Sequence, residues 1–219
     1  MKKHVLLFFI LTLLVTCTNN KNIVTINGET DRLGDAILLK IDPSNKQIDT
    51  TSIKNGKFKF QKSITEEELF RIQFHDGSSF DLLVQVGEKI KINFQGDDLN
   101  IKGSIGSQEI LKLDNKRFQL MAFRDSIAQE LQTNSKDENY EKLMIQKQDD
   151  FFNKLELHRL FLKNFINNNK ESKISLIALF QTYNASSPIL TIDEDIEDFE
   201  KVLKNLKITF PKSNHIQLL

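Results

Sequence analysis

The sequence of 219 residues contains one cysteine, Cys17, and no tryptophan. A single cysteine excludes an intrachain disulfide, a Cys-x-x-Cys redox pair and a zinc site built from cysteines. Glycine and proline number only 8 and 3, which excludes a low-complexity linker chain and a collagen-like fibre. The chain has no excess of basic residues, with 30 Lys+Arg against 30 Asp+Glu. Because neutralising phosphates requires a basic excess or a clearly basic face, we expect no nucleic-acid partner.

The first residues of the chain have the features of an export signal. Lys2 and Lys3 supply positive charge, and an apolar run of 12 residues extends from Val5 to Thr16. A helix needs about 20 apolar residues to cross a bilayer, so this run is too short to span one. Its length and its flanking charges are typical of the apolar region of a secretory signal.

The apolar run ends at the only cysteine, in the sequence Leu14-Val15-Thr16-Cys17. This segment resembles the lipobox of bacterial lipoproteins, in which signal peptidase II cuts before a cysteine that becomes acylated. Thr16 departs from the family pattern, which usually has Gly, Ala or Ser at that position. The alternative is an ordinary secretory signal with an incidental cysteine. The lipobox predicts a signal peptide over residues 1–16.

Acylation of Cys17 predicts a lipid-anchored protein of the cell envelope. Two or more acyl chains hold a protein stably on a bilayer, because each buried CH₂ contributes about 0.8 kcal/mol. Residues 17–22 would form a short lipidated tether. Loss of Lys2 and Lys3 changes the charge from 30 − 30 to 28 − 30, a net −2. The tether lacks the acidic cluster that often marks surface export in such lipoproteins, so we expect an anchor that faces the periplasm.

Residues 23–106 are predicted to form an antiparallel β-domain. Lys57–Gln61 and Lys89–Phe94 alternate between polar and apolar residues, which is typical of half-buried strands. Turn signals recur about every ten residues, as expected for an antiparallel sandwich or barrel-like domain. Asn27-Gly28 is expected to end the first strand, and Asn55-Gly56 is expected to join two strands in a hairpin.

Residues 107–219 are predicted to form a helical domain of about four helices, because apolar residues now recur at helical spacing. Ser107 is the expected N-cap of the first helix. Ser135 with Glu138, and Thr191 with Glu194, have the spacing of capping boxes and predict two further helix starts. The whole chain is therefore predicted to be an α+β protein, with a β-domain followed by a helical bundle.

Three short motifs in this order resemble a known family. They are Asn55 to Phe60, which reads Asn-Gly-Lys-Phe-Lys-Phe, Gly87-Glu88, and Gly103-Ser104 before the helices. With the lipobox, this arrangement resembles the DUF4369 family of Bacteroidetes lipoproteins, over Ile23 to about His215. In that family a thioredoxin-like domain of the thiol–disulfide oxidoreductase type usually follows. The resemblance implies the fold, the envelope setting and a thioredoxin-like protein partner.

The resemblance implies no catalytic residue here, because the chain contains no Cys-x-x-Cys and thiol exchange needs an attacking and a resolving thiol. The sequence also lacks the Gly-x-Ser-x-Gly, P-loop and Gly-x-Gly-x-x-Gly motifs. The chain reaches Leu219 just where the thioredoxin-like domain would begin, and the sequence leaves open whether this is its natural end.

The remaining polar candidates predict neither a metal nor a cofactor. His75, His158 and His215 are too scattered for the i, i+4 spacing of a helical zinc site. Asp76, near Asp81, is explained by turn chemistry. Three acidic groups are interpreted as solvated loop charges or as charges that complement a helix dipole. They are Glu66 to Glu68, Asp97-Asp98, and the cluster from Asp193 to Asp198.

The sequence thus favours a non-catalytic, membrane-anchored envelope lipoprotein that acts as a binding or accessory module. The alternative is the separated N-terminal half of a thioredoxin-like oxidoreductase, with its catalytic domain lost or encoded elsewhere. A hydrolase-type enzyme would require a cleft with convergent carboxylates and shifted pKa values.

Overall fold

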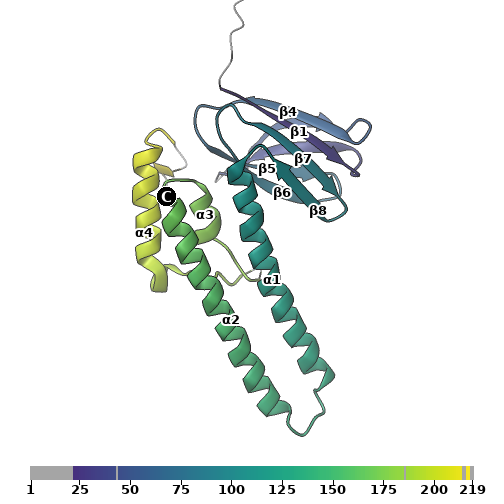
Figure 1. Cartoon of the computed structure of the whole chain (residues 1–219), viewed down its shortest axis with the longest axis vertical. Coiled ribbons are helices and arrows are strands. Elements are labelled where there is room, and N and C mark those ends of the chain that lie inside the picture. Colours follow the sequence, from purple (N-terminus) through teal and green to yellow (C-terminus); the bar gives the residue numbers. More distant parts are fainter. Residues whose placement is uncertain (1–21, 43, 185, 214–215, 218–219) are drawn as a thin grey trace, which may run out of the picture.

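The computed structural model describes residues 22–42, 44–184, 186–213 and 216–217. Within them, eight strands come first and four helices follow, so the predicted α+β architecture is confirmed (Figure 1). The strands are β1 (Ile23–Thr30), β2 (Asp35–Lys40), β3 (Gln47–Ser52), β4 (Lys57–Ser63), β5 (Glu68–Phe74), β6 (Ser79–Val84), β7 (Lys89–Gln95) and β8 (Asp98–Lys102).

The strands form a sandwich of two four-stranded sheets. Sheet A has the order β4-β1-β7-β8 and sheet B the order β3-β2-β5-β6. All neighbouring strands are antiparallel except β1 and β7, which run parallel. Alternate residues of each strand point inward, as in β7, where Ile90, Ile92 and Phe94 are buried and the residues between them are exposed. These inward side chains fill the core between the sheets.

The expected end of the first strand at Asn27-Gly28 is wrong, because β1 continues through both residues to Thr30. Gly28 points into the sandwich, opposite Phe58 on β4. A Cβ atom at position 28 would lie 2.0 Å from the Phe58 ring. The glycine is therefore required by the close packing of an aromatic ring and does not mark a turn.

The turn expected at Asn55-Gly56 forms, but the strands on either side of it do not pair with each other as a hairpin. The two residues adopt positive φ angles of 52° and 71°, so they do form a tight turn. However, β3 before the turn belongs to sheet B and β4 after it belongs to sheet A. The turn carries the chain from one layer of the sandwich to the other.

The helices are α1 (Ile105–Thr133), α2 (Tyr140–Asn169), α3 (Ile174–Leu179) and α4 (Ile192–Thr209). The cap of α1 is Ser104, which accepts a hydrogen bond from the backbone N–H of Ser107, so the expected cap at Ser107 is wrong. The capping box at Ser135 is also wrong, because α2 starts after Asn139. The cap at Thr191 is confirmed by a hydrogen bond from the Glu194 N–H.

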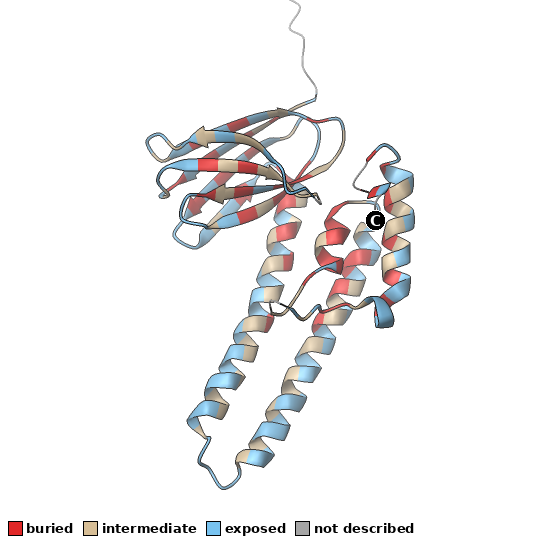
Figure 2. Cartoon of the chain, turned by 180° about the vertical axis from the view of Figure 1, so that it is seen from behind, coloured by how far each residue is buried: buried red, intermediate tan, exposed pale blue. Residues whose placement is uncertain are grey.

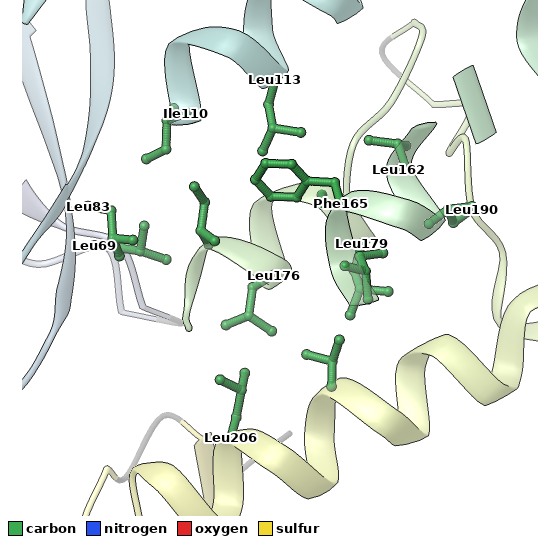
Figure 3. Packing of buried hydrophobic residues seen from close by; sticks show 14 of the residues in the cluster. Leu69, Leu83, Ile110, Leu113, Leu162, Phe165, Leu176, Leu179, Leu190 and Leu206 are labelled. Atoms are coloured by element: carbon green, nitrogen blue, oxygen red, sulfur yellow. The ribbon is translucent and has the colours of Figure 1, made fainter. Parts of the chain in front are cut away.

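A second core joins the helices to the outer face of sheet B (Figure 3). Leu69 of β5 and Leu83 of β6 point out of the sandwich toward Ile110 of α1 and Leu176 of α3. A Cβ atom at Gly106 would lie 2.7 Å from the Leu83 side chain, so α1 starts in close contact with the sheet. The two parts of the chain are thus packed on each other through apolar side chains.

The far halves of α1 and α2 form a hairpin that extends away from both cores (Figures 1 and 2). Leu120 is the last buried residue of α1 and His158 is the first buried residue of α2. Between these two positions the helices have only half-buried and exposed side chains. No helix in the described part of the chain combines the length and the apolar character needed to cross a membrane.

Candidate functional site

The expected lipidation residue Cys17 and the lipobox residues Leu14, Val15 and Thr16 lie outside the described residues. The structure therefore does not bear on the signal peptide or the tether, and both stay predictions. The described chain starts at Asn22, directly before β1, which is the second strand of sheet A.

The histidines do not form a site among the described residues. His75 is exposed in the turn after β5, and His215 lies outside the described residues. His158 is buried in α2, where one ring nitrogen lies 2.6 Å from the side-chain oxygen of Gln181. Burial lowers the pKa of His158, and the bond to Gln181 offsets this only in part. Over the described ranges, no group of three or more His, Cys, Asp or Glu is placed to hold a metal ion.

The interpretation of Glu66 to Glu68 as solvated charges is wrong, because this loop binds the start of α3. Lys173 is buried, and its Nζ donates to a Glu66 carboxylate oxygen at 2.8 Å and to the Glu67 carbonyl at 2.6 Å. Its backbone N–H donates to the Glu67 carboxylate at 2.6 Å. The acidic loop therefore attaches the sandwich to the helices. Asp97 and Asp98 are exposed, as expected.

The acidic cluster at the start of α4 does more than complement the helix dipole, because one of its members, Asp195, joins α4 to α2. The side chain of Asp195 is fully buried and lies between α4 and α2. It accepts hydrogen bonds from Arg159 at 3.0 and 3.1 Å and forms an ion pair with Lys163 at 2.6 Å. Burial by itself would raise the pKa of Asp195, but the bond to Lys163, the Thr191 N–H and the Arg159 charge outweigh it, and the pKa is lowered.

A charged cleft of about 490 Å³ lies where sheet B meets α1 and α3. Arg71 of β5 donates to both carboxylate oxygens of Asp81 on β6, at 2.6 and 2.9 Å. On α1, the Arg117 guanidinium lies 3.8 Å from the Asp114 carboxylate. The charged side chains that give the cleft its name thus form two arginine–aspartate pairs.

Asp114 is a carboxyl group of the charged cleft whose pKa is raised. Burial raises its pKa and the nearby Asp81 charge raises it further, while Arg117 and Arg71 act in the opposite sense. The cleft is thus lined by the carboxylates of Asp42, Asp81 and Asp114, and an arginine lies next to Asp81 and next to Asp114. No Ser, Cys or His lines the cleft among the described residues, whereas Thr182 and aspartates do.

An apolar groove of about 230 Å³ adjoins the charged cleft. Phe180 lines both hollows and is 58% exposed. Ile192 and Ile196 across the groove are 59% and 45% exposed. The rings of Phe199 and Phe180 meet edge to face, with their centroids 5.9 Å apart. Large apolar side chains that gather on a surface in this way mark binding sites. The residues that define this partner groove are Leu179, Phe180, Ile192, Ile196, Phe199 and Leu203.

The third surface is a broad hollow of about 880 Å³ on the outer face of sheet A. Five lysines and a single acidic residue, Glu29, line it, together with amide side chains such as Asn27. The helices pack on the outer face of sheet B, so this face of sheet A points away from them. The lysines that define the lysine face are Lys54, Lys57, Lys59, Lys91 and Lys102.

Sequence reasoning missed all three surfaces for identifiable reasons. The charged cleft collects side chains that lie far apart in the chain, such as Asp81 of β6 and Asp114 of α1, and has no local pattern. In the partner groove, Ile192, Ile196, Phe199 and Leu203 do recur at helical spacing on α4, but this pattern alone does not distinguish an exposed apolar face from a buried one. The lysine face does have a local signal: lysines at every second position of β4 and β7 must point to one side of the sheet. The register that aligns them with Lys102 became visible only in the structure.

Residues 24–110 match the sequence model of a domain of unknown function, DUF4369. The match spans nearly all of the sandwich and the first residues of α1, so the expected resemblance is confirmed over this part of the chain. A search of curated proteins finds no match to the chain.

Proposed function

We propose that the chain is a non-catalytic accessory module of the cell envelope, held on a membrane by a lipid on Cys17, which binds a partner protein through the partner groove. The observation that carries this proposal is the cluster of exposed Phe180, Ile192 and Ile196 around a hollow on α3 and α4. Exposing three large apolar side chains side by side is unfavourable in water, and a partner that covers them removes this cost.

The chemistry of the surface restricts the partner. A complementary surface would place an apolar side chain in the partner groove and polar groups against the adjoining charged cleft. An apolar centre with a polar rim is the usual arrangement of a protein interface. A peptide helix or loop of a folded protein fits this description better than a small polar metabolite does.

A thioredoxin-like protein is the first partner to test. In the family that the sequence resembles, such a domain follows the helices. Ile216 is buried in the same core as Leu176 and Leu179 of α3, so a domain attached after Ile216 in a relative would follow directly on the helical core. The alternative is that the chain is the N-terminal half of an oxidoreductase whose catalytic domain is separate.

The partner groove can be tested by placing a photo-crosslinking amino acid at position 180 in the full chain in cells. The matched control carries the same group at Ile208, which is 71% exposed on α4 and does not line the groove. The proposal expects a discrete crosslinked partner at position 180 and none at position 208. Equal or absent crosslinking at both positions would contradict it.

The anchor and the absence of catalysis need separate measurements. Labelled palmitate should enter the wild-type chain and not the Cys17→Ala variant. Purified protein should show no insulin reduction on its own. A hydrolase would be indicated by turnover of ester, amide or glycoside substrates that is lost in Asp114→Asn, because Asp114 is the carboxyl in the charged cleft whose pKa is raised by burial.

A further inference from the structure

Most lysines of the lysine face form no ion pair in the described part of the chain; the exception is Lys57, whose Nζ lies 3.4 Å from the Glu29 carboxylate. The register aligns Lys59 of β4 with Asn27 of β1, Asn27 with Lys91 of β7, and Lys91 with Lys102 of β8. Lys91 and Lys102 are thus directly opposite each other, an arrangement in which like charges repel and destabilise a sheet. In the part of the chain that the structure describes, neither side chain has an ion-pair or hydrogen-bond partner, although both backbones belong to the sheet ladder.

The chemistry of this face favours an extended anionic surface as its ligand. The outward side chains of sheet A are mostly lysines, amides, hydroxyls and a few acids, together with Ile23. Phe58 also lines the hollow, but it is only 4% exposed, so the face offers no aromatic surface for stacking on sugars or on unpaired bases. The hollow is broad and open, and its lysines come from several strands, so it suits many separate anionic groups better than one small anion.

The position of the expected anchor selects the kind of anionic surface. Cys17 precedes the start of β1 by six residues, which span at most about 20 Å when extended. β1 belongs to sheet A, and its residue Asn27 lies between Lys59 and Lys91 of the lysine face. Asn27 is about 14 Å along β1 from Ile23. β1 also starts at the side of the molecule away from the tip of the α1–α2 hairpin (Figure 1). A lipid on Cys17 would therefore hold the lysine face within reach of the bilayer.

We propose that the lysine face lies against the anionic phospholipid headgroups of the membrane that holds the anchor. The inference rests on the proposed lipid on Cys17. An acyl anchor and a basic patch are the two kinds of signal that together give stable membrane attachment. Contact through this face leaves the partner groove free, because the groove lies on the helices that pack against the opposite sheet.

The direct test uses the chain from residue 17 onward with Cys17→Ser, which contains every described residue and cannot be acylated. Its binding is measured by co-sedimentation with vesicles of phosphatidylcholine alone and of phosphatidylcholine with 30% phosphatidylglycerol. We expect binding only to the anionic vesicles, with an affinity that falls as salt increases, because surface charges are screened within about 10 Å at 0.1 M salt.

A charge-matched pair of triple variants tests the face itself. Each lysine close to an anionic membrane contributes a factor of about five in affinity, so Lys59→Gln, Lys91→Gln and Lys102→Gln together should weaken binding about 100-fold. The control carries the same loss of charge at exposed lysines on the hairpin tip, α2 and α4, and should change binding less than threefold. The control residues are Lys136, Lys142 and Lys204.

Folding of the variants is checked by circular dichroism, where Lys91→Gln alone should leave the melting temperature unchanged or raise it. Three outcomes would overturn the proposal: equal binding to neutral and anionic vesicles, an equal loss in the control, or binding to a soluble acidic polysaccharide without binding to vesicles. Palmitate labelling distinguishes failure of the anchor from failure of the face, because vesicle binding here is measured without the lipid.

Discussion

The buried carboxylate of Asp195 gives a stability prediction that can be controlled closely, because a second aspartate, Asp193, lies in the same first turn of α4. Asp195 connects α4 to α2 through Arg159 and Lys163, and its side chain is fully buried. Asp193, two residues earlier in the same first turn, is exposed and has no such partners in the described part of the chain. Asp195→Asn and Asp193→Asn remove the same charge from the same helix start.

The expected magnitude follows from the contacts that each change removes. Breaking a buried ion pair by removing one partner typically costs about 3–5 kcal/mol. In Asp195→Asn one oxygen acceptor stays, and Arg159 keeps its bond to the Ile189 carbonyl at 2.6 Å, so we expect a smaller loss of about 2 kcal/mol. Asp193→Asn removes only its interaction with the helix dipole, worth about 0.3–1 kcal/mol.

Urea unfolding followed by circular dichroism measures both variants, and a 2 kcal/mol loss should also lower the melting temperature by about 4–8 °C. Because the pKa of Asp195 is lowered in the folded state, its contribution is complete above the unfolded value of about 3.9 and is lost as pH falls through the lower folded value. The gap between wild type and Asp195→Asn should therefore close at low pH. A gap of less than about 0.5 kcal/mol between the two variants at pH 7 would refute this account.

Three further predictions concern other parts of the fold. The lowered pKa of His158 means that stability should fall as pH drops below the unfolded value of about 6.5, and His158→Gln should flatten this dependence in urea titrations between pH 5 and 7. Gly28→Ala should lower the free energy of unfolding by about 1–3 kcal/mol, because its Cβ atom would clash with the Phe58 ring. A double-mutant cycle should show a smaller loss when the same change is made in a Phe58→Leu protein. Leu120→Ala should lower the free energy of unfolding by about 2–5 kcal/mol, and Leu131→Ala should lower it by less than about 1 kcal/mol. Hydrogen exchange of the backbone amides in the far half of the α1–α2 hairpin should be fast in both the wild type and Leu131→Ala.

The element types could be predicted from the sequence because each depends on local periodicity. Alternation in β4 and β7 and helical spacing after Gly106 reflect which face of an element meets the core. The errors arose where a local signal had a different tertiary cause. Gly28 resembles a turn glycine but accommodates the Phe58 ring, and Asn55-Gly56 is a true turn whose strands pair in different sheets.

The acidic residues show why a candidate site is harder to predict than a strand. Glu67 and Asp195 resemble any surface carboxylate in the sequence, and only the fold brings Lys173 to one and Arg159 to the other. Asp114 of the charged cleft has Arg117 three residues later on its own helix, but the charges of Asp81 and Arg71 act on it from sheet B. In each case the role depends on at least one group more than 30 positions away, about which local sequence carries no information.

The zero net charge of the chain conceals a separation of charges that bears on the proposed membrane contact. Several of the acidic side chains form internal ion pairs, as at Lys173 and at Asp195, where they attach the helices to the sandwich and to each other. Among the described residues that line the lysine face, Glu29 is the only acidic one against five lysines, so the local charge of this hollow is positive although the whole chain is neutral. Bulk charge therefore argues against a nucleic-acid partner that needs an overall basic protein, but it does not exclude a local anionic contact. A chain held close to a bilayer needs only one such face.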